Sequence, residues 1–362
     1  LKFERLIESY ISNIPYGFSS FRKSIPLWLG NRLFQKKIIS EKLSFGKNKF
    51  PKDKIFFSEH HFSHAASAFF PSPFSDANIL TIDGVGEHST TTIGYGNCDS
   101  IELKEELNFP HSLGLLYSAF TYYLGFKVNS GEYKVMGLAP YGKPIYLQEL
   151  EKIIKLTDDG FFKLNRRYFN HFEEGVKMEW DGGIPIIESL FTKNWENLFG
   201  KSRAKDDKLE KRHINLATSA QKLTEKVIFH ILNHLQKETG CDNICITGGV
   251  AQNSVVNGKI LENTSFKRIY IPSAGHDAGT SIGSSLYLYN QLLGYDRIPE
   301  IRSAYFGRKF NNQEVIKVLD KEDVKYRVLS DKDLFEIVSE SLVNGGVIGW
   351  FQGRAEFGPR AL

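Results

Sequence analysis

The chain has only three cysteines among its 362 residues, Cys98, Cys241 and Cys245. Three thiols are too few for the disulfide framework that holds many small secreted domains together. Long apolar runs are also missing, because none reaches the roughly 18 residues of a transmembrane helix. No basic start followed by an apolar stretch marks a secretory signal. These absences exclude a disulfide scaffold and a membrane partner, and we expect a cytoplasmic protein.

The charge balance shows no excess of one sign that would indicate a polyanionic partner. Lys and Arg number 46 and Asp and Glu number 42, which gives a formal net charge of +4. Proteins that bind nucleic acid usually carry a concentrated basic face, so we expect no nucleic-acid partner. With 41% hydrophobic and 13% aromatic residues, the chain can form a globular core. At roughly 100 to 200 residues per domain, the length predicts two or three domains.

Apolar patterns predict an α/β succession of elements. Short, nearly continuous apolar runs favour buried strands, and apolar residues at three- and four-residue steps favour amphipathic helices. Strands are expected at 79–83, 89–95, 243–247 and 268–271, and helices at 59–69, 113–126 and 214–236. Residues 130–142 indicate an irregular, glycine-rich loop, and 150–212 an inserted, partly exposed region.

The pattern changes after Pro299. The order helix, strand, helix, strand is expected there, at 305–320, 326–329, 334–343 and 347–351. Neither a fixed-period repeat nor a low-complexity tract occurs in the sequence. We therefore predict a domain boundary between residues 303 and 304.

Two histidines with helical spacing form the first candidate site. His60 and His64 are four residues apart in a predicted helix, so both imidazoles project from one face and can bind one metal ion. Asp83, at the end of a buried strand, and Asp277 would add carboxylates, and this ligand set suits Fe²⁺, Mn²⁺ or Zn²⁺. The competing interpretations are packed histidines, a turn aspartate and a helix N-cap.

Two glycine turns are candidates for anion binding. Gly84 and Gly86 precede Glu87 in a strand-to-strand bend, where positive φ at the glycines would leave backbone N–H groups free to hold a phosphate. Gly248 and Gly249 lie between a strand and a predicted helix, where amides and the positive helix end suit a phosphate or nucleotide. Ordinary glycine turns would explain both segments.

Charged side chains in two further segments complete the candidates. Lys134 lies in the expected loop 130–142, where its ammonium could meet a phosphate oxygen as a point charge. Arg354 and Arg360 flank a Gly/Pro turn, and two guanidinium groups held in this way suit bidentate binding of phosphate. Plain turns and exposed salt bridges are the competing explanations.

In their order along the chain, six motifs resemble those of the NodU/CmcH-type O-carbamoyltransferases, enzymes that carbamoylate nodulation factors, antibiotics and related sugars. The motifs are His60 to Ala65, Ile82 to Glu87, Ser112 to Ser118, Lys134 to Gly142, Ile246 to Asn253 and Gly353 to Leu362. The resemblance implies an actin/sugar-kinase/Hsp70 ATPase-like, ribonuclease H-like α/β domain over 1–303, lacking its first strands. It also implies the truncated start of an α/β YrdC-like domain over 304–362. We therefore expect a piece of a longer protein, inactive or impaired on its own.

The resemblance further implies a carbamoyltransferase that uses carbamoyl phosphate and ATP. Carbamoyl-adenylate would form first, and its carbamoyl group would pass to a hydroxyl of a sugar or glycoside. The implied metal, iron before manganese or zinc, would bind His60, His64, Asp83 and Asp277, and the catalytic residues would be His60, His64, Asp83 and Lys134. Nucleotide contacts would come from Gly84, Gly86, Glu87, Gly248, Gly249, Val250, Asn253 and Asp277, and carbamoyl phosphate contacts from Arg354 and Arg360.

Other functions fit the same pattern. A tRNA threonylcarbamoyl transferase-like ATPase and a sugar kinase of the same fold remain alternatives, although a kinase needs no paired histidines. A nucleotide-binding scaffold without chemistry would not need the two histidines and two aspartates together. A homodimer is one assembly that the sequence allows.

Overall fold

The computed structural model describes residues 3–11, 14–15, 17–30, 32–46, 48–181 and 184–359. The chain divides into two compact units, Leu1–Ile301 and Arg302–Leu362. This division lies close to the boundary predicted after residue 303, and the domain type of the second unit stays a prediction. None of the described helices combines the length and the apolar character that crossing a membrane requires.

The elements are numbered in chain order. The strands are β1 (Asp76–Gly86), β2 (Ser89–Asn97), β3 (Ser100–Asn108), β4 (Ile154–Leu156), β5 (Phe162–Leu164), β6 (Met178–Asp181), β7 (Ile184–Ile187), β8 (Asn243–Thr247) and β9 (Arg268–Tyr270). The helices are α1 (Phe3–Ile11), α2 (Phe18–Gly30), α3 (Gln35–Lys42), α4 (His60–Phe69), α5 (Leu113–Tyr123), α6 (Glu132–Leu138), α7 (Leu147–Ile153), α8 (His171–Glu174), α9 (Asn194–Phe199), α10 (Lys211–Thr239), α11 (Ser254–Asn257), α12 (Ile260–Asn263), α13 (Thr280–Leu286), α14 (Asn312–Lys321) and α15 (Asp331–Val343).

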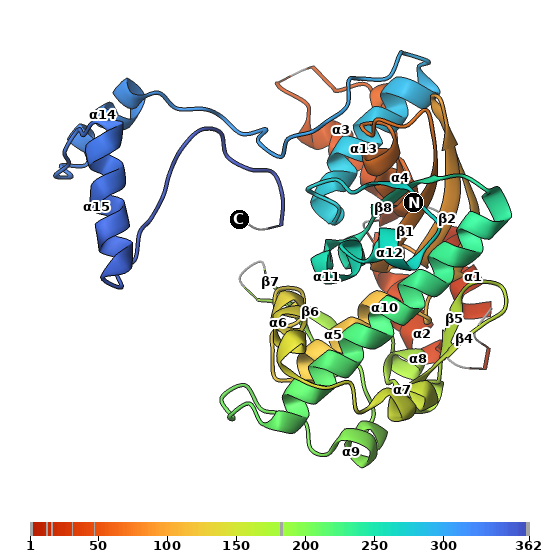
Figure 1. Ribbon diagram of the computed structural model, residues 1–362. Coiled ribbons are helices and arrows are strands. Elements are labelled where there is room, and N and C mark those ends of the chain that lie inside the picture. The colour runs from red at the N-terminus through yellow and green to blue at the C-terminus, as the bar shows by residue number, and fades with distance from the viewer. Residues whose placement is uncertain are drawn as a thin grey trace. The chain divides into compact units, whose positions relative to one another are not determined.

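A five-stranded mixed sheet forms the centre of the first unit, in the order β3-β2-β1-β8-β9 (Figure 1). β1 pairs with β2, and β2 with β3, in antiparallel fashion, whereas β8 runs parallel to β1 and β9 runs parallel to β8. The predicted hairpin and the two later strands are therefore confirmed. This mixed sheet is consistent with the α/β fold that the family resemblance implies.

Side chains of β1 alternate between two cores. Ile79 packs among apolar side chains of α4 and α13 on one face of the sheet, while Leu80 and Ile82 pack with α5 and α10 on the other. Side chains along a strand point alternately to its two faces. Asp83, four residues after Ile79, is therefore expected on the same face as Ile79. Its carboxylate is therefore directed to the α4 side of the sheet, even though β1 becomes irregular after Ile82.

α4 and α13 approach each other closely at a glycine. A Cβ atom built on Gly283 of α13 would lie only 1.7 Å from the carbonyl oxygen of Ser63 in α4. No real Cβ tolerates that separation, so the contact of the two backbones requires glycine. α13 follows Asp277 directly in the chain, and this packing holds the aspartate near α4.

One predicted loop of the first unit differs from expectation, and the following region contributes more to the core than its composition indicated. Residues 130–142 are not an irregular loop, because they form α6 and a 3-10 turn, Ala139–Tyr141. The region 150–212 is partly exposed, as predicted, but it also places Phe162, Phe169 and Trp195 in the main core, each at most 1% exposed. Its charged positions lie between apolar ones that pack inward, and the mixture obscured the pattern.

The second unit forms the two predicted helices. α14 begins at Asn312, later than predicted, because the Asn311 side chain accepts a hydrogen bond from Glu314 N and so caps the start of the helix. The predicted strands at 326–329 and 347–351 are wrong, since these residues are irregular. A strand is stable only when its backbone groups pair with a neighbour. Among the described residues beyond 301, the one pairing that occurs is the isolated bridge between Lys309 and Arg354.

Candidate functional site

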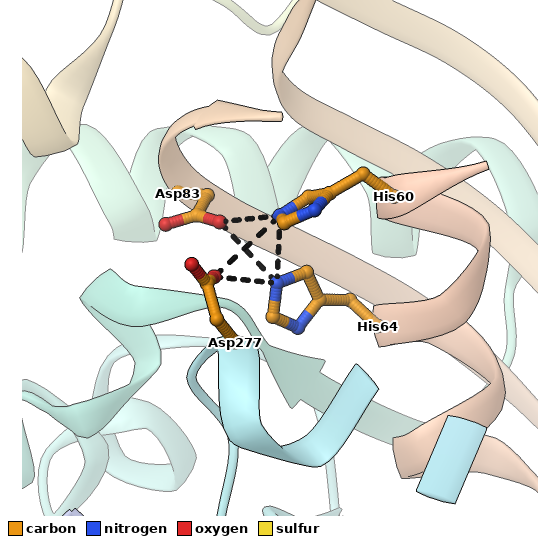
Figure 2. Close-up of side chains that lie close together, drawn as sticks. All are labelled: His60, His64, Asp83 and Asp277. Carbon is orange, nitrogen blue, oxygen red and sulfur yellow. Dashed lines mark hydrogen bonds and ion pairs between the residues drawn. The ribbon is translucent and has the colours of Figure 1, made fainter. Parts of the chain in front are cut away.

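Two histidines and two aspartates from three segments meet on the α4 side of the sheet (Figure 2). His60 and His64 lie one turn apart on α4, Asp83 comes from β1, and Asp277 begins the 3-10 turn Asp277–Gly279 before α13. One ligand atom of each residue lies within 4.8 Å of those of the other three. The structure thus brings together all four residues predicted to bind a metal.

The two imidazoles face both carboxylates through their Nε2 atoms. His60 Nε2 lies 3.0 Å from Asp83 Oδ2 and 3.6 Å from Asp277 Oδ1. His64 Nε2 lies 3.3 Å and 3.5 Å from the same two oxygens. The two Nε2 atoms are themselves only 3.1 Å apart. Two nitrogens at that distance need a proton or a metal ion between them, and the two facing carboxylates favour positive charge at this point.

Burial and charge act in opposite directions on these groups. Burial alone would lower the pKa of His64, whose side chain is 0% exposed, but contacts with Asp277 and Asp83 raise it from 6.5 to about 9. Burial alone would raise the pKa of Asp83, but hydrogen bonds to His60 and His64 hold it well below its usual value. Without a metal ion, His64 is therefore an imidazolium paired with carboxylates at neutral pH.

Asp83 is oriented by backbone amides. Its Oδ1 accepts hydrogen bonds from Gly84 N at 2.7 Å and Gly249 N at 3.4 Å, which leaves Oδ2 directed at the imidazoles. The Asp277 side chain is instead 74% exposed. The cluster is therefore closed on the β1 side and open to solvent beside Asp277.

The residues fit a divalent transition metal ion. Two imidazole nitrogens and two carboxylate oxygens that face one point are ligands of the type that such ions take. The open side beside Asp277 would leave room for an oxygen of a substrate. Among the described residues, this is the one group of three or more His, Cys, Asp or Glu side chains with such convergence.

The first glycine turn differs from its prediction. β1 continues through Gly86, and the positive φ belongs to Glu87 at 62° and not to Gly84 or Gly86. Gly86 is needed for space, since a Cβ there would lie 2.4 Å from the Cδ2 atom of His60. The expected positive φ at these glycines is wrong because both lie within β1, where Gly86 pairs with Ser89 and Gly84 lies in the irregular stretch after Ile82. Their contact with a nucleotide, and that of exposed Glu87, stays a prediction.

The second glycine turn has the expected backbone but also internal partners. Gly248 has φ 95°, and its amide donates to Gly275 O at 2.8 Å. Val250 lies in the 3-10 turn Gly249–Gln252 and packs against the core. The Asn253 side chain caps α11 and bonds to Gln221 at 3.1 Å and 2.9 Å. The predicted nucleotide contacts of these residues remain to be tested.

Three further residues were predicted to act in catalysis or to bind carbamoyl phosphate. Lys134 lies on α6, with its ammonium 5.9 Å from the ring centroids of Phe126 and Tyr133. Arg354 belongs to the second unit, where it donates to Gly307 O at 3.0 Å, and Arg360 lies outside the described residues. Their predicted catalytic and carbamoyl phosphate-binding roles stay predictions.

Two residues with contacts close to the cluster had no predicted role. Buried His61 bonds to Thr92 Oγ1 at 3.2 Å, and burial lowers its pKa to about 3. Buried Thr247 donates its hydroxyl to Gly275 O at 3.1 Å, two residues before Asp277. The sequence did offer one signal for a role of Thr247, which is its position at the end of a predicted strand and next to two glycines.

Comparison with known proteins places these residues in a wider context. The family described as "Carbamoyltransferase N-terminus" matches residues 1–286. An uncharacterised protein of Synechocystis is 44% identical over 99% of this chain and 58% of its own length. Nodulation protein NolNO of Sinorhizobium fredii is 34% identical over 85% of this chain and 42% of its own. Nodulation protein NolO of Bradyrhizobium diazoefficiens is 32% identical over 84% and 51%.

The chain spans about half the length of these curated relatives. Among solved structures, HypF of T. kodakarensis covers 66% of this chain and 37% of its own, with a TM-score of 0.34 and 13% identity.

Proposed function

The chain belongs to the carbamoyltransferase family, and from this premise we propose that it acts in the transfer of a carbamoyl group to a hydroxyl of a sugar or sugar-containing natural product. Its similarity to two nodulation proteins and the order of its six motifs support an O-carbamoyltransferase. The single observation that carries the proposal is the convergence of His60, His64, Asp83 and Asp277 within 4.8 Å.

The proposed donor is carbamoyl phosphate, activated by ATP. Hydrolysis of carbamoyl phosphate by water would give carbamate and inorganic phosphate. Attack of a carbamate oxygen on the α-phosphorus of ATP would then give carbamoyl-adenylate and release pyrophosphate. A hydroxyl of the acceptor would then attack the carbamoyl carbon, and AMP would leave. Such a mixed anhydride is a reactive acyl donor, and its departing phosphate needs stabilisation by hydrogen-bond donors. Backbone amides at the end of β1 are the proposed source in the first unit.

We also propose that the four-residue cluster holds a divalent ion, Fe²⁺ in the first place and Mn²⁺ or Zn²⁺ as alternatives. When bound, such an ion supplies Lewis-acid chemistry, which polarises a carbamoyl oxygen or lowers the pKa of an acceptor hydroxyl. Asp83, oriented by two amides, and buried His64 form the rigid side of the cluster. Exposed Asp277 borders the side from which a substrate would approach.

Activity is tested with the full-length protein that contains this chain. Labelled carbamoyl phosphate, ATP, Fe²⁺ and a panel of sugar acceptors are expected to give pyrophosphate, AMP and a carbamoylated sugar. An Asp277→Asn protein should lose transfer, because the amide removes one negative charge and one metal ligand. Release of ADP with phosphorylated sugar would support the sugar kinase instead. Transfer to tRNA would support the tRNA threonylcarbamoyl transferase-like alternative.

Metal binding should depend on pH through His64. The metal-free protein holds a proton on this imidazole up to its raised pKa of about 9, and a metal ion binds only the neutral ring. The affinity for Mn²⁺ is therefore expected to rise about tenfold per pH unit between pH 6.5 and 8 as the proton competes less. Titration calorimetry in two buffers of different ionisation enthalpy would measure the proton release, and a pH-independent affinity would contradict the prediction.

A further inference from the structure

The Thr247–Gly249 turn at the end of β8 contacts both segments that carry the carboxylates of the cluster. On one side, Gly249 N donates to Asp83 Oδ1 at 3.4 Å. On the other, Thr247 Oγ1 and Gly248 N donate to Gly275 O at 3.1 Å and 2.8 Å. Gly275 lies two residues before Asp277 in the chain. One turn therefore links the two acidic ligands, which come from distant parts of the sequence.

We propose that this turn positions both carboxylates for the metal ion, with Gly249 setting the rotation of the Asp83 carboxylate and Thr247 setting the backbone that precedes Asp277. The inference rests on the proposed metal site. These are positioning residues, since none of them contributes one of the four converging ligand atoms. The role differs from the phosphate binding predicted for the turn, because its amides are directed at protein oxygens.

Gly249 is suited to this role because its missing side chain leaves room for one orientation of Asp83. A Cβ atom built on Gly249 would lie 2.9 Å from Asp83 Oδ1. The atom in contact is the end of a side chain, so a Gly249→Ala protein can fold if the carboxylate rotates away. That rotation would turn Oδ2 from its positions 3.0 Å and 3.3 Å from the two imidazoles. The substitution therefore acts on ligand geometry more than on folding.

Thr247 provides an independent connection. Its side chain is fully buried, and its hydroxyl shares the Gly275 carbonyl with the Gly248 amide. A Thr247→Val protein keeps the branched shape and removes only the hydroxyl. The Gly275 carbonyl would then keep only the hydrogen bond from Gly248 N, and the backbone between Gly275 and Asp277 would be held less firmly. A Thr247→Ser protein keeps the hydroxyl and should bind metal as the wild type does.

The test measures Mn²⁺ binding to the metal-free chain from the EPR signal of the free ion. Residues that orient metal ligands typically change affinity by about 10- to 100-fold, and we expect a weakening of that size for Gly249→Ala and for Thr247→Val. Matched controls are Gly258→Ala, whose Cβ would meet its nearest neighbour at an ordinary 3.5 Å, and Thr224→Val, whose hydroxyl bonds to Ala220 O within α10. Both controls should bind like the wild type, and circular dichroism checks that each variant is folded.

The outcomes separate the two proposals. If the wild-type chain binds no Mn²⁺, both the metal site and this inference fail. If the wild type binds and both Gly249→Ala and Thr247→Val bind within twofold of it, the positioning role is overturned while the metal site stands. A change in ATP binding at unchanged Mn²⁺ affinity would also overturn it, in favour of a phosphate-binding turn. Rescue by Thr247→Ser supports the hydroxyl as the active feature.

Discussion

A His64→Ala protein is expected to lose metal binding by more than the hundredfold that is typical when only an orienting residue is removed. His64 supplies one of four converging ligand atoms, and its fully buried ring provides the nitrogen on the closed side of the cluster. Elemental analysis of the purified protein and Mn²⁺ titration both measure the loss. In the metal-free state, the substitution also removes the cation that faces Asp83 and Asp277.

The control must separate loss of a ligand from loss of a buried ring. His171→Ala serves this purpose, since His171 is also buried and its Nε2 bonds to Pro110 O at 2.9 Å, not to the cluster. Its replacement leaves a cavity of the same kind and should reduce stability without changing metal content. Equal metal content in wild-type and His64→Ala proteins would remove this histidine from the site.

The second large effect is expected for Gly283→Ala, as a loss of stability. The new Cβ would lie 1.7 Å from Ser63 O, 2.7 Å from Ser63 C and 2.8 Å from Ser67 N. All three are backbone atoms of α4, so the clash is relieved only by moving one helix away from the other. Overpacking of this kind costs about 1–3 kcal/mol and occasionally more, and we expect at least the upper end, measured by urea unfolding of the metal-free protein.

Displacement of α13 should also weaken Mn²⁺ binding, because this helix directly follows Asp277 while α4 carries both histidines. Gly137→Ala is the matched control for stability. It lies in α6 with no atom within 4 Å of the added Cβ, and alanine is favoured over glycine within a helix by about 0.5–1 kcal/mol. A Gly283→Ala protein as stable as the Gly137→Ala protein would show that the two helices do not need this close contact.

Local patterns were enough to predict the elements that carry the site. The apolar run of β1, the small residues of α4 and the long amphipathic stretch of α10 are short-range signals with periods of two or 3.6 residues. They also indicated that His60 and His64 share one helix face and that Asp83 belongs to a strand, although β1 continues beyond it to Gly86. These features depend on residues close together in the chain, so they can be derived without knowledge of packing.

The same reasoning failed where pairing decides the conformation. Gly84 and Gly86 belong to an extended strand, and the left-handed residue of the hairpin is Glu87. Glycine content indicated a bend but not the residue at which β2 begins to pair. At 326–329 and 347–351, apolar composition predicted strands, yet among the described residues beyond 301 they have no paired neighbour.

The sequence by itself determined which faces of α4 and β1 carry the imidazoles and the first carboxylate, since those positions follow from helix and strand periodicity. Asp277 was predicted as a further ligand, but only the tertiary structure shows how it reaches the other three residues and that the Thr247–Gly249 turn holds both acidic segments. The reason is that β8 and β9 add in parallel beside β1, which brings the carboxyl ends of β1 and β8 to one edge of the sheet. Contacts between segments so far apart in the chain depend on strand order and helix packing, and no local pattern encodes them.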